Sequence, residues 1–161
     1  NWTRIAYGFI AMLEDEFGKD RARRLVATMA YKGGRRRIEA WLQRNQAEEL
    51  TPELMVRFQD HSHLSQGPDH ACSFMTYVPN GCVLRRTACG WHDGRPEGME
   101  SYCKHTSEAF FQAYKDVQPK LSIDIPRCRS RGTSEEGCEI RYLWRNRTRH
   151  GDGPVEGSED G

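Results

Sequence analysis

Two segments near the C-terminal end decide the fold: Lys-Leu-Ser-Ile-Asp-Ile-Pro at 120–126 and Gly-Cys-Glu-Ile-Arg-Tyr-Leu-Trp at 137–144. In both, apolar residues alternate with polar ones, which is the period of a strand with one buried face. The residues between them, 127–137, include Gly132 and Gly137, which suit tight backbone turns. The two segments therefore predict a β-hairpin.

A second hairpin is predicted upstream of the first. Residues 71–78 are rich in strand-forming side chains, Pro79-Asn80-Gly81 is typical of a turn, and the chain returns through 82–87. Between the two hairpins, 90–98 reads as a loop and about 97–117 as a helix. Four residues of this helix share one face: Cys103, Ser107, Phe110 and Tyr114.

The first part of the chain predicts helices. Residues 3–17 carry an apolar stripe of Ile5, Phe9, Leu13 and Phe17, and Gly18 ends the helix. A second helix is expected after Asp20 as N-cap, reaching about Asn45, with an interruption at Gly33-Gly34. Its expected inward residues are Ala22, Leu25, Val26, Met29 and Ala30. A third begins at Pro52, capped by Thr51, and the polar residues 60–69 are expected to form a loop.

This order of elements predicts an α+β domain over 1–145. An antiparallel sheet of about four strands carries the N-terminal helices and one long helix on one face. From Asn146 the chain is nearly devoid of apolar residues, so 146–161 is expected to be a flexible tail.

The overall charge favours neither nucleic acid nor a membrane surface as a partner. The 161 residues include 24 basic and 23 acidic side chains, which gives a formal net charge of +1. No apolar run approaches the roughly 20 residues that cross a bilayer. The cluster Arg35-Arg36-Arg37 is interpreted as a solvated helix face. A homo-oligomer stays open.

The six cysteines are expected to be reduced thiols in a cytoplasmic protein, because a chain of this length builds a core without disulfides. No metal or cofactor is expected, because CxxC pairs and nucleotide-binding glycine motifs are absent, and the cluster Asp60-His61-Ser62-His63 is of a kind that usually stays solvated.

Cys103 is the best nucleophile candidate, because it lies near the start of a predicted helix and beside Lys104. Cys89 and Cys138 lie at the ends of candidate strands, where distant segments can converge. His92 or His105 is the candidate proton shuttle, although a helical His105 points roughly 200° away from Cys103. Core packing is the competing interpretation for every cysteine, and it is favoured for three of them: Cys72, Cys82 and Cys128.

These residues also carry a resemblance to a known family. The pattern Glu16-Phe17-Gly18-Lys19-Asp20-Arg21-Ala22, a cysteine followed after a Gly-containing loop by Tyr102-Cys103, and Gly137-Cys138-Glu139-Ile140 together resemble the L-2-amino-thiazoline-4-carboxylic acid hydrolase family. The likeness covers roughly residues 3–144. It implies a small hydrolase that opens a C–N or C–S bond in a cyclic, amidine-like ring bearing a carboxylate, as in natural-product metabolism.

The resemblance carries the family's cysteines onto Cys89, Cys103 and Cys138. The family generally has an Asp one turn after the middle cysteine, and Thr106 and Ser107 occupy that turn here. A hydroxyl does not act as a carboxylic acid or base near neutral pH, so these two residues are assigned to substrate binding. Arg85 or Arg86 is the candidate clamp for the substrate carboxylate, since an arginine fork binds carboxylate through two hydrogen bonds.

Three functions stay open at this point. The first is a cysteine-dependent hydrolase, or related ring-modifying enzyme, for a small amino-acid-derived heterocycle. The second is a non-catalytic sensor module in which the cysteines hold a metal or another ligand. The third is a partner subunit that keeps the fold and has lost the chemistry. The catalytic assignment depends on Cys89, Cys103 and Cys138 meeting in one hollow between sheet and helix.

Overall fold

The computed structural model describes residues 2–64 and 73–145. Within them the helices are α1 (Trp2–Phe17), α2 (Lys19–Arg44), α3 (Pro52–Leu64), α4 (Gly90–Asp93) and α5 (Cys103–Val117). The strands are β1 (Ser73–Val78), β2 (Gly81–Arg86), β3 (Leu121–Arg127) and β4 (Cys138–Trp144), and the 3-10 turn η2 spans Arg129–Arg131. Cys72, residues 65–69 and the tail at 146–161 lie outside the described residues.

The four strands form one antiparallel sheet in the order β1-β2-β4-β3. Both predicted hairpins are present, and β2 pairs with β4 to join them. Asn80 has a φ of 59° in the first hairpin turn, a left-handed conformation that Asn tolerates better than most residues. Pro126 lies on β3, an edge strand, where the missing backbone N–H removes no ladder hydrogen bond from a central position. The α+β prediction is confirmed.

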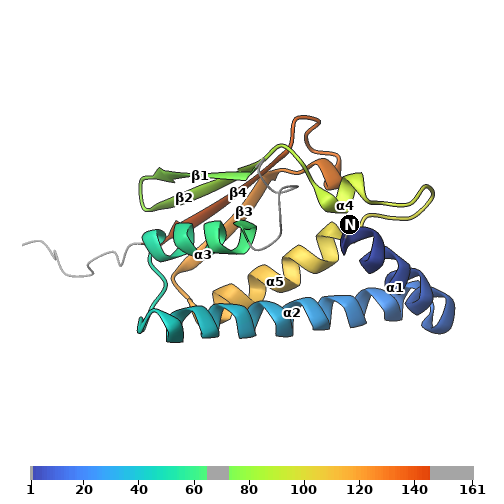
Figure 1. Ribbon diagram of the computed structural model, residues 1–161, viewed down its shortest axis with the longest axis horizontal. Helices are drawn as coiled ribbons and strands as arrows, with labels where there is room; N and C mark the ends of the chain where they lie inside the picture. Colours follow the sequence, from blue (N-terminus) through green and yellow to red (C-terminus); the bar gives the residue numbers. More distant parts are fainter. Residues whose placement is uncertain (1, 65–72, 146–161) are drawn as a thin grey trace, which may run out of the picture.

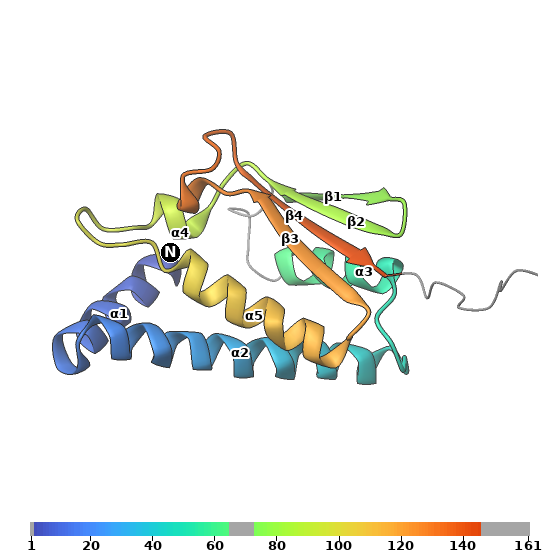
Figure 2. The same ribbon diagram turned by 180° about the vertical axis from the view of Figure 1, so that it is seen from behind.

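The helices cover one face of the sheet. In Figure 1, and from behind in Figure 2, α5 lies between the sheet and the long helix α2, and α3 lies under the β1–β2 hairpin. The main core joins these layers through buried side chains of α2, α3, α5 and the sheet: Ile38, Trp41, Met55, Phe58, Leu84, Tyr114, Ile140 and Tyr142. A smaller core under α1 contains Tyr7, Ile10 and Tyr102.

The predicted break at Gly33-Gly34 is wrong, because α2 continues through both residues. A Cβ at Gly34 would lie 2.9 Å from the ring and 3.1 Å from the carbonyl oxygen of Phe110 on α5. The glycine therefore allows α2 and α5 to approach closely. The N-cap is Gly18 instead of the predicted Asp20, which lies in the first helical turn.

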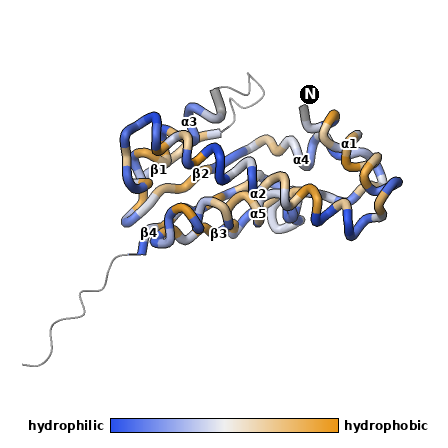
Figure 3. Tube along the Cα trace, turned by 90° about the horizontal axis from the view of Figure 1, so that it is seen from below, coloured by the Kyte–Doolittle hydropathy of each residue, from blue (hydrophilic) through white to orange (hydrophobic). Residues whose placement is uncertain are grey.

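The apolar stripe expected on the first helix does not face the core of the chain. Ile5 is 51% exposed, Phe9 63% and Phe17 43%, whereas Tyr7 and Ile10 are buried. On α2, the predicted inward residues Leu25 and Met29 are likewise exposed, while Ala22 is buried. Figure 3 shows the hydrophobic residues along α1. The helical period was read correctly, but the buried face is the neighbouring one.

Three boundaries differ from the prediction. The helix α3 runs to Leu64, into the expected loop, and the Thr51 hydroxyl caps it by accepting a 3.3 Å hydrogen bond from the Leu54 N–H. The short helix α4 replaces part of the loop expected at 90–98. The helix α5 begins at Cys103 rather than near Glu97, which sets this cysteine in the first turn. No helix within the described residues is long and apolar enough to cross a membrane.

Candidate functional site

Four cysteines from four segments meet at one end of the sheet. Cys89 immediately precedes α4, Cys103 opens α5, Cys128 follows β3, and Cys138 begins β4. The Sγ atom of Cys128 lies 3.8 Å from that of Cys103 and 3.7 Å from that of Cys138. Cys128 therefore lies at the centre, with a thiol on either side.

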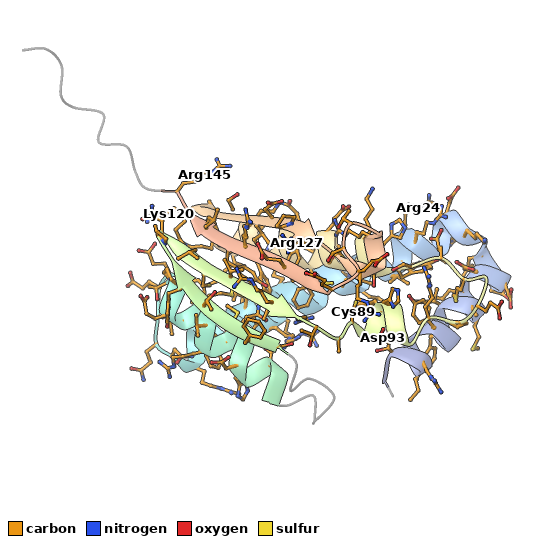
Figure 4. All side chains as sticks on the ribbon, turned by 90° about the horizontal axis from the view of Figure 1, so that it is seen from above. Arg24, Cys89, Asp93, Lys120, Arg127 and Arg145 are labelled. Atoms are coloured by element: carbon orange, nitrogen blue, oxygen red, sulfur yellow. The ribbon has the colours of Figure 1, made fainter. Side chains whose placement is uncertain are left out.

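Cys89 is held at the edge of this cluster by polar contacts. Its Sγ lies 3.0 Å from the Ser130 hydroxyl oxygen, and its backbone N–H donates a 3.0 Å hydrogen bond to Asp93. Cys89 and Asp93 lie beside each other at α4 in Figure 4. The carboxylate of Asp93 is within 3.4 Å of Arg129, so α4 is tied to η2.

The two thiols that contact Cys128 stabilise its thiolate. Hydrogen bonds from Cys103 and then Cys138 lower the pKa of Cys128 well below that of an ordinary thiol, and the backbone N–H and charge of Arg131 act in the same direction. The same hydrogen bonds raise the pKa of Cys103 and of Cys138, because each donor must keep its proton. These contacts therefore favour the thiolate at Cys128 and the protonated thiol at Cys103 and Cys138.

Cys89 is the second acidic thiol. A hydrogen bond from Cys138, followed by those from Ser130 and the His92 backbone N–H, lowers the pKa of Cys89 to about 6 against the opposing effect of burial. By contrast, burial in the main core raises the pKa of Cys82 to about 12. Position in the fold thus favours the thiolate at Cys89 and disfavours it at Cys82.

All four clustered cysteines line a cavity of ≈ 630 Å³. Its walls come from α1, α2, α3, α5 and the sheet, and include the apolar side chains Phe110, Phe111, Ile125 and Ile140. This volume is in the range of pockets that bind small molecules. The predicted meeting of Cys89, Cys103 and Cys138 between sheet and helix agrees with this placement.

Two arginines reach the same cavity, Arg37 from α2 and Arg86 from β2. Arg37 donates a 2.7 Å hydrogen bond to the Ser62 hydroxyl, and its guanidinium lies 5.6 Å and 5.7 Å from the ring centroids of Phe58 and Phe110. Of the described residues that line the cavity, none is Asp, Glu or His. Among the described residues the lining therefore presents two guanidinium groups and no carboxylate, which suits a ligand that bears a carboxylate.

Three of the predicted site residues do not line the cavity. His92 Nδ1 lies 3.0 Å from Asp93, and His105 Nε2 lies 3.5 Å from Glu100. Arg85 Nε donates to Glu139 at 3.0 Å. Both histidines therefore interact with carboxylates outside the cavity, and of the two candidate carboxylate clamps it is Arg86 that reaches the cavity.

Thr106 and Ser107 do line the cavity, but their hydroxyls are engaged with the helix. Thr106 donates to the Tyr102 carbonyl at 2.9 Å, and Ser107 donates to the Cys103 carbonyl at 2.6 Å. Ser107 also accepts a 2.7 Å hydrogen bond from Arg131. These residues fix the start of α5 and orient Arg131, the cation beside Cys128.

Sequence reasoning missed Cys128 and Arg37. Core packing is the interpretation that the sequence favours for Cys128. In the observed hairpin, however, β3 ends at Arg127 and β4 begins at Cys138, so Cys128 lies next to Cys138. Arg37 was interpreted as part of a solvated cluster, although it is one helical turn before the core residue Trp41. Two features of the sequence could have identified these residues. Cys128 directly follows a predicted strand of the hairpin, and Arg37 lies one helical turn before the predicted apolar residue Trp41.

Within the described residues, no group of three or more His, Cys, Asp or Glu side chains is arranged to hold a metal ion. Comparison with protein-family models and with curated proteins finds no match to this chain.

Proposed function

We propose that this protein uses a cysteine thiolate to open or modify the ring of a small, amino-acid-derived heterocycle that bears a carboxylate. The observation that carries the proposal is the position of Cys128 between two thiols on the wall of a cavity that also holds two arginines. A thiolate is the nucleophilic form of cysteine, and Cys128 takes over the role that sequence reasoning gave to Cys103.

The reaction requires an electrophilic carbon, which a cyclic amidine or thiazoline provides between its two heteroatoms. The Cys128 thiolate adds to that carbon, the bond to one ring heteroatom breaks, and the leaving atom takes a proton. Water then attacks the carbon and displaces the Cys128 sulfur. The sum is the addition of one water molecule across the ring bond, with the thiolate restored.

The neighbouring thiols are the proton donors in this scheme. Cys103 and Cys138 keep their protons next to Cys128, because their pKa values are raised by that contact. Once the Cys128 sulfur is bonded to the substrate carbon it no longer holds these protons, so either thiol can protonate the leaving heteroatom and take a proton back from the attacking water. This route needs neither His92 nor His105, both of which lie outside the cavity lining.

Arg86 is the proposed carboxylate clamp, with Arg37 as a second cation. A guanidinium binds carboxylate through two parallel hydrogen bonds, and such pairs are stronger where water is excluded. Arg37 is oriented by Ser62 and two aromatic rings, so its charge is held in place before a ligand binds.

One observation favours a second candidate, a ligand-binding module without turnover. The described lining has no Asp, Glu or His that could act as a general base on the attacking water. A module of this kind would bind the same carboxylate-bearing molecules and retain them unchanged. In both cases the described free cysteines suit a reducing compartment, and we propose the cytoplasm.

The test is incubation of the purified chain with a panel of cyclic amidine carboxylates, including 2-amino-thiazoline-4-carboxylate. Mass spectrometry should detect the ring-opened product, heavier than the substrate by one water. Turnover should disappear in Cys128→Ser and persist in Cys82→Ala, a core cysteine outside the cavity lining. A ligand that raises the melting temperature without being consumed would favour the binding module, and a panel with neither binding nor turnover would contradict both.

We also propose that a second copy of the chain packs against α1. Ile5, Phe9 and Met12 are 51%, 63% and 66% exposed, and the helical period sets them on one face. Monomeric proteins rarely leave such a continuous apolar stripe in water. Gly8 lies beside it, and among the described residues no atom outside its own stretch of helix lies within 4 Å of an added Cβ, so another helix can approach closely.

The charges at the two ends of this face fit a twofold-symmetric partner. Arg4 lies at the start of α1 and Asp15 and Glu16 at its end, and all three are exposed. When two copies of α1 cross antiparallel near Phe9, the basic end of each helix meets the acidic end of the other. A twofold interface requires this kind of self-complementarity.

A further inference from the structure

We propose that Cys128 and Cys138 form a dithiol site that hydroperoxides oxidise to a disulfide. This chemistry goes beyond the ring-opening reaction, because it uses the same thiolate toward a different electrophile, the O–O bond. The two cysteines lie at the open end of the β3–β4 hairpin, Cys128 directly after β3 and Cys138 at the start of β4.

The backbone positions of the two residues suit a disulfide. The register of β3 and β4 pairs Arg127 with Glu139, and one further step sets Cys128 opposite Cys138. The backbone N–H of Cys128 donates to the Thr133 hydroxyl, and its carbonyl accepts from the N–H groups of Arg131 and Thr133, so its backbone bonds within the connecting loop just beyond the last ladder pair. Paired antiparallel strands have Cα atoms about 4.5–5.5 Å apart, inside the range of roughly 4.4–6.8 Å that disulfides span, and Cys128 and Cys138 are one residue from such a pair.

The sulfur atoms are already close. The Sγ atoms of Cys128 and Cys138 lie 3.7 Å apart, and both line the ≈ 630 Å³ cavity, which a molecule as small as hydrogen peroxide can enter. An S–S bond is about 2.0 Å long, so forming the disulfide requires the two sulfur atoms to move closer by roughly 1.7 Å. Both sulfurs belong to one hairpin. The alternative pair, Cys103 with Cys128 at 3.8 Å, would join the first turn of α5 to the hairpin.

A hydroperoxide accepts the two electrons that the two thiols lose when they form a disulfide. The Cys128 thiolate attacks one oxygen of the O–O bond, which gives a sulfenic acid and releases the other oxygen as hydroxide, or water after protonation. The Cys138 sulfur then attacks the sulfenic sulfur, the disulfide forms, and a second water leaves. A dithiol loses two electrons and two protons while the peroxide becomes two waters. Arg131 beside Cys128 favours the thiolate that starts this sequence.

The experiment treats the fully reduced chain with equimolar hydrogen peroxide at neutral pH and reads intact mass and disulfide-mapped peptides. We expect the mass to fall by two hydrogens and a peptide pair joined through Cys128 and Cys138. In the double variant Cys103→Ser with Cys138→Ser, which removes both thiols in contact with Cys128, the sulfenic acid should persist and add dimedone at Cys128, whereas Cys128→Ser should lose both products. Cys82→Ala is the matched control and should behave as the parent chain.

Several outcomes overturn the proposal: no loss of mass, a disulfide through Cys103 instead, or dimedone on a residue other than Cys128. One zinc ion per chain that protects all four thiols would also overturn it. If Cys128 is also the nucleophile of the proposed function, the disulfide abolishes turnover and dithiothreitol restores it; this consequence alone rests on the proposed function. Because the mapping reads the sulfurs directly, a disulfide without turnover would sustain the dithiol site and refute the hydrolase.

Discussion

At the scale of single residues, the hydrogen bonds around each sulfur separate the cysteines more than their sequence neighbours do. Cys103 has a lysine beside it and opens a helix, which made it the predicted nucleophile, yet its contact with Cys128 raises its pKa. Hydrogen bonds from Cys103 and Cys138 lower the pKa of Cys128. Cys103 is distant from Cys128 in the sequence, and Cys138 lies across the hairpin loop. The hydrogen bonds between these thiols depend on the tertiary structure, so the sequence alone does not predict which thiol has the lowest pKa.

The Ser130 hydroxyl provides a residue-scale test. It lies 3.0 Å from Cys89 Sγ and contributes to the lowered pKa of that thiol. In Ser130→Ala the midpoint of the pH profile for iodoacetamide labelling of Cys89 should rise from about 6 by roughly half to one pH unit, because a hydrogen bond is worth about 1 kcal/mol and one pH unit about 1.4 kcal/mol. Ser134→Ala, in the same loop, is the control and should leave the midpoint unchanged.

The same lowered pKa links folding to pH. A thiol whose pKa is lower in the folded state than in the unfolded one, near 8.5, is deprotonated more readily on folding. Its contribution to the free energy of unfolding is therefore complete above about pH 8.5 and is lost as the pH falls through the folded-state value, about 6 for Cys89. A Ser130→Ala midpoint identical to that of the parent chain would contradict the assigned contact.

At the scale of elements, alternation and helical period predicted the hairpins, the sheet and the long helices, because both signals depend on local geometry. Gly33-Gly34 was misread for the same reason. Glycine destabilises an isolated helix, but Gly34 faces Phe110 on α5, and the gain from that close packing is invisible in α2 alone.

The paired glycines make a matched test of this packing. Gly33 has no atom within 4 Å of an added Cβ, so Gly33→Ala should raise the free energy of unfolding by about 0.5–1 kcal/mol through helix propensity. Gly34→Ala should be less stable than Gly33→Ala by roughly 1–3 kcal/mol, because its methyl group meets the Phe110 ring and carbonyl. Thermal or urea unfolding measures both, and equal stabilities would refute the close contact between α2 and α5.

At the scale of the whole molecule, periodicity identifies an amphipathic helix but not the partner that covers its apolar face. The sequence predicts an apolar stripe that includes Ile5, Phe9 and Phe17, and the structure leaves these three residues exposed. The apolar residues of α1 do form one face of the helix. The proposed second copy of the chain would cover that face.

Charge reversal tests that assembly. The chain should sediment as a dimer at micromolar concentration, and Arg4→Glu should shift it toward monomer by placing like charges at both ends of the interface. Combining Arg4→Glu with Glu16→Arg should restore the dimer, which separates a specific antiparallel pairing from a general loss of solubility. Sedimentation velocity reads all three, and a parent chain that stays monomeric at 100-fold higher concentration would contradict the proposal.

The central claim is that Cys128 is a thiolate in the folded protein at neutral pH, and thiolate absorbance near 240 nm measures it most directly. An acid titration of the reduced chain should retain thiolate absorbance below about pH 5, where Cys89, with a pKa of about 6, and ordinary thiols, with a pKa near 8.5, are largely protonated. That absorbance should be missing from folded Cys128→Ser and should move to the ordinary range when the parent chain is unfolded in guanidinium. If absorbance instead appears only above about pH 8 in the folded parent chain, Cys128 is an ordinary thiol and the account is contradicted.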